Sequence, residues 1–306
     1  MNPLLSIVIP TYERVESLRI NLPSILEDAS QFSIAVYISD DSRSEDVAAC
    51  CSELKKTYGN IFYIKNQSRL GHDGNFLAAL RQGNSEYTWI LGDRVALRKG
   101  AIKTLFDVID KNEFDIISVN KVGRNINFDT GYYDNSLTVL KKFGWHLTYT
   151  GATVYSRRVV NKSFQFDLDR SKNFPQVALI FNYLSGHCSF FWINDLLVEG
   201  VASTQSYWTS NAFSVFIEDW ENVISRLPEI YSAEVKDDIM LAHSRNTQLF
   251  SSKFIMKLRA EGHFDSKTLE KYGARILAHS GLGYFHLYCL SIFPRWVLKL
   301  LKRLVS

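Results

Sequence analysis

Residues 5–14 read Leu-Ser-Ile-Val-Ile-Pro-Thr-Tyr-Glu-Arg, and this stretch decides the fold class. Its first half is an apolar, β-branched run that ends at a proline, which is typical of a strand buried on both faces of a parallel sheet. Three more short apolar runs, at 34–38, 61–64 and 86–91, are expected to be strands. Stretches with helical spacing of apolar residues separate them. Strands that alternate with helices in this way predict right-handed β-α-β units and an α/β fold with a mostly parallel, Rossmann-like sheet.

The second half of the chain has a different pattern. The alternation of strands and helices weakens beyond residue 125, and from Asn211 to the end the spacing is mostly helical. No repeat, low-complexity tract or linker separates the two halves. We therefore expect a sheet domain over residues 1–205 and a helical region over residues 206–306.

Composition excludes several classes of protein. The 35 basic residues exceed the 32 acidic ones by only three, so bulk charge gives no case for binding nucleic acid. The four cysteines lack the spacing of a zinc site and are too few for a disulfide scaffold, which favours a reduced, cytoplasmic setting. The chain begins without a secretory pattern, and no run reaches the roughly 18 apolar residues that span a bilayer. We expect a protein that does not cross the membrane.

Polar residues follow three of the predicted strands at the point where each strand ends. They are Thr11-Tyr12-Glu13-Arg14, Asp40-Asp41-Ser42 and Asp93-Arg94. Ligands bind outside the carboxyl ends of the strands in open α/β sheets, so these clusters predict a site at one sheet edge. Each cluster alone is equally explained by turns and helix caps. The first exit lacks the glycine-rich loop of dinucleotide-binding and P-loop proteins, so cations or a metal would have to hold the phosphates of a nucleotide.

Together these segments resemble the family 2 glycosyltransferases, which have the GT-A fold. The opening strand with its polar exit and the acidic exit of the second strand carry the resemblance, supported by the segments before and within the fourth strand. Two later segments are similar to the abequosyltransferase-like branch, which builds bacterial surface polysaccharides. The segments are 5–14, 38–42, 66–75, 86–93, 142–145 and 151–157.

The resemblance implies a nucleotide-sugar site at the strand exits. Thr11 and Glu13 would line the nucleoside pocket, and Asp40 would accept a hydrogen bond from the base, with helix capping as the alternative for Asp40. Arg14 and Arg69 would reach the ribose or the diphosphate. The complete set of expected nucleotide-binding residues is Pro10, Thr11, Tyr12, Glu13, Arg14, Asp40, Asp41, Arg69, Asn75 and Gly92.

The metal-binding element departs from the family pattern. The resemblance implies an Asp-x-Asp element that binds Mn²⁺ or Mg²⁺, with Asp93 as its first acid, but the run here is Asp93-Arg94-Val95. A divalent ion stabilises the departing diphosphate as a Lewis acid, and a fixed guanidinium can supply part of that stabilisation. One hypothesis is that Arg94 takes over part of the role of the metal and that metal dependence is weak. The alternative is that Asp93 alone holds the ion with water and phosphate oxygens.

The catalytic base is harder to assign. Inverting transfer needs a group that accepts the proton of the acceptor hydroxyl. The family commonly supplies it where this chain reads Asn173-Phe-Pro-Gln176, and a glutamine cannot serve. Asp169 and His146 are the expected catalytic candidates. The other groups considered are Asp167, His187, Glu218 and Asp219.

The C-terminal segment has the pattern of an interfacial helix. After Pro294, apolar Trp296 and Leu300 alternate with basic Arg295 and Lys299. Such a helix lies on anionic lipid, although docking on the protein's own core or on a second subunit would give the same pattern. Membrane contact fits an acceptor carried on a polyprenyl diphosphate, as the resemblance implies.

These observations predict a glycosyltransferase, peripheral on the inner face of the cell membrane. It would transfer a hexosyl or deoxyhexosyl group, with inversion, from a nucleotide-diphosphate donor to a lipid-linked saccharide. A nucleotide-sugar-binding protein that has lost catalysis is the alternative, because the second acid of the metal element and an evident base are both missing. A nucleotidyltransferase is disfavoured because it would need a glycine-rich, basic loop after the first strand.

Overall fold

The computed structural model describes residues 3–124, 126–201 and 208–305. The chain divides into two compact units, Met1–Ser203 and Thr204–Ser306. The domain boundary expected at 205/206 falls outside the described residues. Each unit is described by itself below.

The described strands of the first unit form one mixed sheet, in the order β3-β2-β1-β4-β8-β6-β9-β5, with β7 beside β9. Its first four strands run parallel, which confirms the predicted Rossmann-like half. Antiparallel pairings of β4 with β8, β8 with β6, and β9 with β5 and β7, together with a parallel pairing of β6 with β9, complete the sheet. The strands are β1 (Leu5–Thr11), β2 (Ala35–Asp40), β3 (Ile61–Lys65), β4 (Tyr87–Ile90), β5 (Val95–Leu97), β6 (Ile116–Lys121), β7 (Gly131–Tyr133), β8 (Thr153–Ser156) and β9 (Phe190–Gly200).

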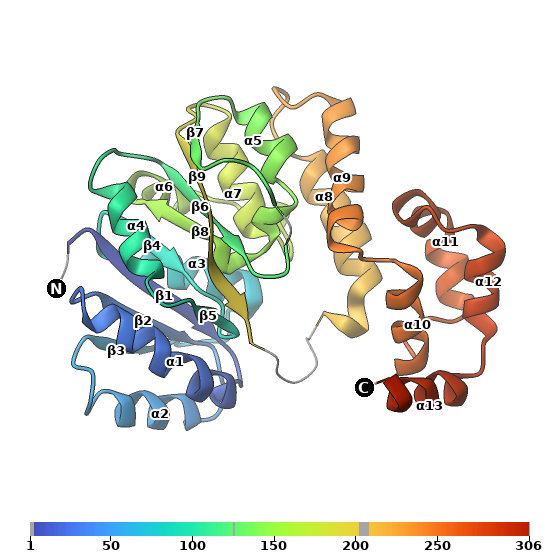
Figure 1. The fold of residues 1–306 in the computed structure, drawn as a ribbon, viewed down its shortest axis with the longest axis horizontal. Helices are drawn as coiled ribbons and strands as arrows, with labels where there is room; N and C mark the ends of the chain where they lie inside the picture. The colour runs from blue at the N-terminus through green and yellow to red at the C-terminus, as the bar shows by residue number, and fades with distance from the viewer. Residues whose placement is uncertain (1–2, 125, 202–207, 306) are drawn as a thin grey trace. The chain divides into compact units, whose positions relative to one another are not determined.

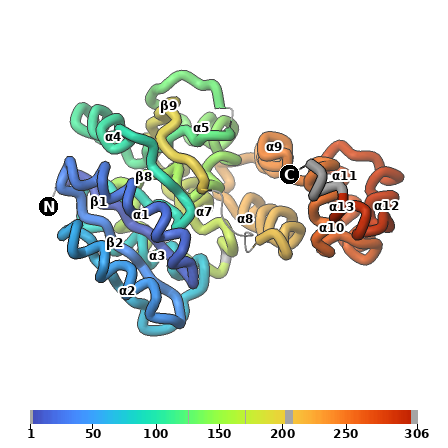
Figure 2. Tube along the Cα trace, turned by 60° about the horizontal axis from the view of Figure 1, so that its bottom comes forward, coloured from blue at the N-terminus to red at the C-terminus, as the bar shows by residue number. Residues whose placement is uncertain are grey.

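Helices cover both faces of this sheet (Figure 1). On one face α1 contacts α2 and α4, and on the other α3 contacts α6 and α7. Figure 2 shows α3 and α7 side by side. The helices of this unit are α1 (Val15–Ser30), α2 (Asp46–Leu54), α3 (Gly71–Gln82), α4 (Ala101–Ile109), α5 (Ser136–Phe143), α6 (Arg157–Ser163) and α7 (Pro175–Leu184).

The core of the first unit explains why these runs become strands. Ile7, Val8 and Ile9 in β1 are buried, as expected for a strand covered on both faces. Trp89 in β4 is also fully buried, and its indole N–H donates to the carbonyl of Gly151 at 3.0 Å. Burying each large apolar side chain contributes about 1.5–3 kcal/mol. Trp89 is therefore a core residue of the first unit.

The second unit is helical, as the sequence predicts. Serine or aspartate side chains cap the N-termini of α9, α10 and α11, and left-handed Gly262 and Gly281 end α10 and α11. Pro294 divides α12 from α13, again as predicted. No helix within the described ranges is both long and apolar enough to cross a membrane. The α-helices are α8 (Trp220–Ser225), α9 (Ala233–Thr247), α10 (Ser252–Glu261), α11 (Ser266–Ser280), α12 (Tyr284–Ile292) and α13 (Arg295–Val305), after a π-helical turn at Ser214–Asp219.

Candidate functional site

Side chains at the C-terminal ends of β1 and β4 are in contact with each other. Thr11 is the last residue of β1, and Asp93 follows β4 by three residues. The hydroxyl of Thr11 donates to one carboxylate oxygen of Asp93 at 3.3 Å, and the guanidinium of Arg14 donates to the other at 3.2 Å. The amide of Asn21 fixes the Asp93 backbone by donating to its carbonyl at 2.7 Å. The structure thus gathers three predicted site residues at one corner of the sheet.

Burial sets the electrostatics of this corner. The Asp93 side chain is only 12% exposed, and burial raises the pKa of its carboxyl group, against the opposing effects of Arg14, Thr11 and Arg94. The Arg14 side chain remains 29% exposed. The pair therefore presents a guanidinium, fixed by a carboxylate, at the edge where ligands bind in α/β sheets.

Asp40 is occupied by the protein itself. It is fully buried, and its carboxylate accepts hydrogen bonds from the Ser42 amide at 2.9 Å, the Tyr63 hydroxyl at 2.8 Å and the Lys65 ammonium at 3.3 Å. A side chain with no exposed surface does not reach a nucleotide base. The geometry supports a structural role for Asp40 in place of the base contact that we expected.

Asp41 and Asn75 tie the strand exits to α3. The carboxylate of Asp41 accepts hydrogen bonds from the Leu70 and Gly71 amides, at 2.8 and 2.9 Å, and from the side chain of Asn66. Asn75 donates to the carbonyls of Thr11, the last residue of β1, and of Ser39, the next-to-last residue of β2. It accepts from the side chains of Ser39 and Asn66. Both side chains are buried, so they hold the frame of the site and do not face a ligand directly.

The segment after β1 keeps its predicted exposure. Glu13 has a left-handed backbone (φ 51°), and its carboxylate accepts from the Arg43 amide at 2.6 Å. The Arg69 guanidinium lies 4.8 Å from the ring centre of Tyr12, and both side chains are exposed. This stacked pair is free to meet a flat base or a phosphate. Pro10 in β1 is half-buried, and Gly92 accepts from the Val95 amide in the turn after β4.

Val95 stands where the resemblance implies a second metal-binding acid, and its side chain lies in the core. Val95 is 5% exposed, and a Cβ placed on Gly151 would lie 2.8 Å from its nearest methyl group. Both carboxylate oxygens of Asp93 already accept hydrogen bonds from protein groups. In the part of the chain that the structure describes, no cluster of three or more acidic, histidine or cysteine side chains could hold a metal ion.

The two predicted bases have different surroundings. His146 is fully buried, its ring lies 2.9 Å from the Val119 carbonyl oxygen, and burial next to Arg124 lowers its pKa to about 3. That geometry does not support proton transfer with an acceptor. Asp169 is exposed in the turn Leu168–Arg170. Four residues later, the Asn173 amide donates to the Asp73 carboxylate in the first turn of α3, which holds this segment beside the strand exits.

Three functional candidates were missed in the sequence. Lys121 ends β6, Arg124 follows it after one tight turn, and both lie over the ring of Tyr149. The available signal was Gly123 between two basic residues directly after a strand-like run, a further polar exit like those of β1, β2 and β4. Arg94 lies close enough to this group for its charge to lower the pKa of Tyr149.

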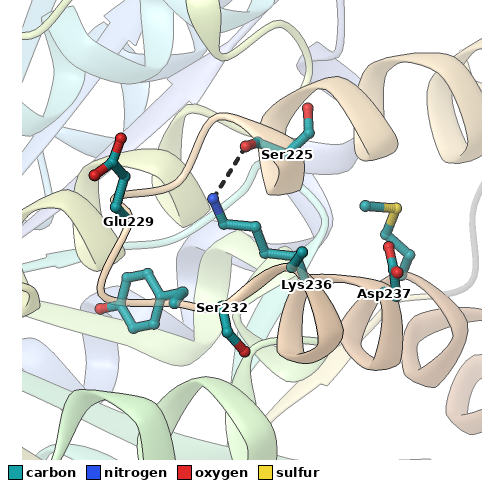
Figure 3. A pocket seen from close by; sticks show the side chains of 8 residues that line it. Ser225, Glu229, Ser232, Lys236 and Asp237 are labelled. Atoms are coloured by element: carbon teal, nitrogen blue, oxygen red, sulfur yellow. Dashed lines mark hydrogen bonds between the residues drawn. The ribbon is translucent and has the colours of Figure 1, made fainter.

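The second unit has a polar hollow between α8 and α9, shown in Figure 3. The ammonium of Lys236 donates to the Ser225 carbonyl at 3.1 Å and to the Leu227 carbonyl at 2.6 Å. Lys236 thereby satisfies carbonyl groups at the C-terminal end of α8. The Lys236 ammonium therefore links α9 to the end of α8, and we assign no function to this hollow.

The sequence profile described as "Glycosyl transferase family 2" matches residues 6–167, which is more than half of the chain. The chain belongs to this family. The match covers the exits of β1, β2 and β4, the Asp93 corner and the basic turn after β6. The family assignment therefore agrees with the resemblance of the strand exits.

Two curated bacterial relatives match part of the chain. Abequosyltransferase RfbV of Salmonella typhimurium is 34% identical over 109 residues, which are 35% of this chain and 33% of that protein. The "GalNAc(5)-diNAcBac-PP-undecaprenol beta-1,3-glucosyltransferase" of Campylobacter jejuni is 32% identical over 104 residues, 34% of this chain and 33% of that protein. The matched stretch spans about a third of each relative.

Solved structures match nearly the whole chain in fold. TarS residues 1–349 from S. aureus superposes with a TM-score of 0.61 at 13% identity, over 99% of this chain and 92% of that one. The mannosyltransferase PcManGT from Pyrobaculum calidifontis, solved with GDP-Man and Mn²⁺, superposes with a TM-score of 0.59 at 13% identity. That match covers 99% of this chain and 88% of the mannosyltransferase chain. At this identity the likeness shows the fold, which confirms the predicted GT-A class.

Proposed function

We propose that this chain transfers a sugar from a nucleotide-diphosphate donor to a saccharide carried on a polyprenyl diphosphate, in the assembly of a bacterial surface polysaccharide. Family membership supports the reaction class, and the names of the two curated relatives support the acceptor class. In this proposal residues 1–205 bind the donor and the acceptor. The single observation that carries it is the convergence of Thr11, Arg14 and Asp93 at the sheet edge.

The corner offers a physical route to transition-state stabilisation. Charge develops on the diphosphate as the bond to the sugar breaks, and a fixed guanidinium stabilises that charge without reorganising. Asp93 holds Arg14 at this edge, while Arg94 adds a second positive charge nearby. We assign the diphosphate to these two arginines and the nucleoside to the exposed Tyr12–Arg69 pair.

Asp169 remains the proposed base. It is an exposed carboxylate, and the Asn173–Asp73 hydrogen bond holds its segment beside the start of α3. An acceptor hydroxyl placed there would transfer its proton to Asp169 as the new bond to the sugar forms. Asp169→Asn should remove most of the turnover and leave donor binding unchanged, with Asp107→Asn, at an exposed position on α4, as the matched control.

A binding protein without catalysis is the second candidate. The observation that favours it is Val95, which occupies the core where the family pattern has a metal-binding acid. A panel of nucleotide sugars separates the two functions. Donor hydrolysis, or transfer to a lipid-linked saccharide, supports the transferase, whereas saturable donor binding without turnover of any donor supports the binding protein.

We further propose that α12 and α13 lie on the inner face of the cell membrane. Phe285 is 77% exposed and Trp296 is 67% exposed, and Arg295 and Lys299 on α13 are exposed with them. Aromatic side chains beside cations are typical of a helix at an anionic lipid surface. Sedimentation with phosphatidylglycerol vesicles should fall for Trp296→Ala and stay constant for Trp208→Ala. Equal sedimentation of wild type and the Trp296 variant would exclude this surface.

A further inference from the structure

The turn after β6 brings two cations together. Lys121 is the last residue of β6, and the Arg124 amide donates to its carbonyl at 3.0 Å. Gly123 has a φ of 82°, a left-handed conformation that favours glycine and makes this tight turn possible. The pairing register of β6 with β9 shifts at Asn120 and again at Lys121. Irregularities of this kind redirect side chains and are common beside active sites.

Both cations lie over one aromatic ring. The Lys121 ammonium is 4.9 Å and the Arg124 guanidinium carbon 5.6 Å from the ring centre of Tyr149, and Arg124 is also 5.2 Å from the ring of Trp145. A ring attracts a cation but leaves its charge in place. The two charges therefore repel each other: the pKa of Lys121 is lowered by burial and by Arg124, and burial lowers the pKa of Arg124 to about 10.

The protein gives these cations neutral partners. Arg124 donates to the carbonyls of Trp145 and His146 and to the hydroxyl of Thr148, and Lys121 donates to the carbonyl of Val122. Neither forms an ion pair with an acid in the described ranges. Charges withdrawn from water are normally paired. Among the described residues, this pair of charges has no acidic counter-ion.

Tyr149 adds an open hydrogen-bonding group. Its hydroxyl oxygen is buried and makes no hydrogen bond with any described residue. A Cβ built on Gly200 would lie 3.8 Å from that oxygen, and Gly200 pairs with Val95 across β5 and β9. The hydroxyl thus lies next to the Asp93–Arg94 exit, and the basic turn is continuous with the proposed donor corner.

We propose that Lys121, Arg124 and Tyr149 form a binding site for a diphosphate ester. The guanidinium and ammonium groups would pair with its oxyanions, and the Tyr149 hydroxyl would donate to one of them. This inference rests on the proposed function, whose reaction includes two such groups, one on the donor and one on the carrier of the acceptor. Both share the chemistry that the site recognises.

Calorimetric titration of the full chain with inorganic pyrophosphate tests the site. Lys121→Gln should weaken binding about tenfold, because a charge-assisted contact is lost, and Tyr149→Phe should weaken it severalfold while keeping the ring. The matched control is Lys103→Gln, which removes the same charge from an exposed position on α4 and should bind like wild type. Tyr149→Phe keeps the test valid if the Lys121 variant does not fold. Absence of pyrophosphate binding by wild type, or equal binding by all variants, overturns the proposal.

A second set of titrations identifies the source of the diphosphate. If nucleoside diphosphates lose affinity in Lys121→Gln, the site serves the donor, and if farnesyl diphosphate does, it serves the lipid carrier. Either result supports the site, and no change for either ligand overturns it. Turnover of nucleotide sugars by wild type is measured separately. Its absence would refute the proposed function without altering the pyrophosphate result.

Discussion

Two charged corners of the first unit are built in opposite ways. After β2, the acids Asp40 and Asp41 are buried and surrounded by protein donors. After β6, the cations Lys121 and Arg124 share an aromatic ring, and their partners among the described residues are neutral. A charge that the protein itself neutralises stabilises the fold, whereas a charge without a counter-ion is available to a ligand. The following changes test that distinction, from the largest expected effect to the smallest.

Removing the buried carboxylate of Asp40 should cause the largest loss of stability. Asp40→Ala leaves the Lys65 ammonium and the Tyr63 hydroxyl without their carboxylate, which should lower the free energy of unfolding by about 3 kcal/mol. Urea unfolding of the variant and of wild type measures this change in the free energy of unfolding. Asp107→Ala, in an exposed ion pair, should change stability by less than about 1 kcal/mol. Similar losses for both variants would contradict a structural role for Asp40.

Asp93→Asn should separate activity from stability. Transfer should fall about a hundredfold because Arg14 loses the charge that fixes it. Burial raises the pKa of Asp93, so the folded state binds this proton more tightly than the unfolded state, and stability falls as the pH rises through the raised pKa. The variant should therefore be at least as stable as wild type at neutral pH. Steady-state kinetics measure the loss of transfer activity, and urea unfolding measures the stability. Full activity of the variant would exclude Asp93 from the site.

His146 should make the basic corner sensitive to acid. The folded protein protonates this ring only near pH 3, and the unfolded chain does so near its ordinary pKa of 6.5. Stability should therefore fall with acidification, by about 2 kcal/mol between pH 6.5 and pH 5 from this group alone. His146→Gln, which can still donate to the Val119 carbonyl, should show a shallower dependence. Parallel stability curves for the two proteins would contradict this.

Chelation should have a modest effect on catalysis. If Arg14 and Arg94 provide most of the positive charge at the diphosphate, EDTA should lower the turnover number less than tenfold, and added Mn²⁺ should restore it. Complete loss of turnover in EDTA would show that a metal ion is required and would refute the substitution of arginine for the metal. The assay uses the same nucleotide-sugar panel as above.

The smallest effect is expected at the basic turn. Lys121→Gln removes a charge that pairs with no acid in the part of the chain that the structure describes, so the free energy of unfolding should change by less than about 1 kcal/mol, in contrast to Asp40→Ala. A loss of stability as large as that of Asp40→Ala would show that the Lys121 charge stabilises the fold. It would then contradict the distinction between the two charged corners.

The sequence predicted the parallel half of the sheet and its polar exits because the information there is local. Apolar runs specify β1 to β4, and parallel pairing brings their ends together. Elements β5, β6 and α4 were not assigned, and β7 lies within a stretch read as a loop. Strand β5 has three residues and exists through its pairing with β9, about a hundred residues away. The Lys121–Arg124–Tyr149 group arises from such distant pairings, so periodicity alone could not identify it.

The roles within the site were less predictable than its location. Residue type identified Asp40, Asp41 and Asn75 as polar groups at the strand ends, but only the fold shows that protein donors enclose them. Conversely, Arg14 and Asp93 are 79 residues apart. Separate roles were predicted for the two residues, and the structure pairs them.

The contact between Val95 and Gly151 limits how the chain can change. A carboxylate at position 95 would be buried close to Gly151, and a charge withdrawn from water is costly unless it is paired. Any larger residue at position 151 would in turn collide with the valine methyl groups. Val95 therefore restricts position 151 to glycine in this structure.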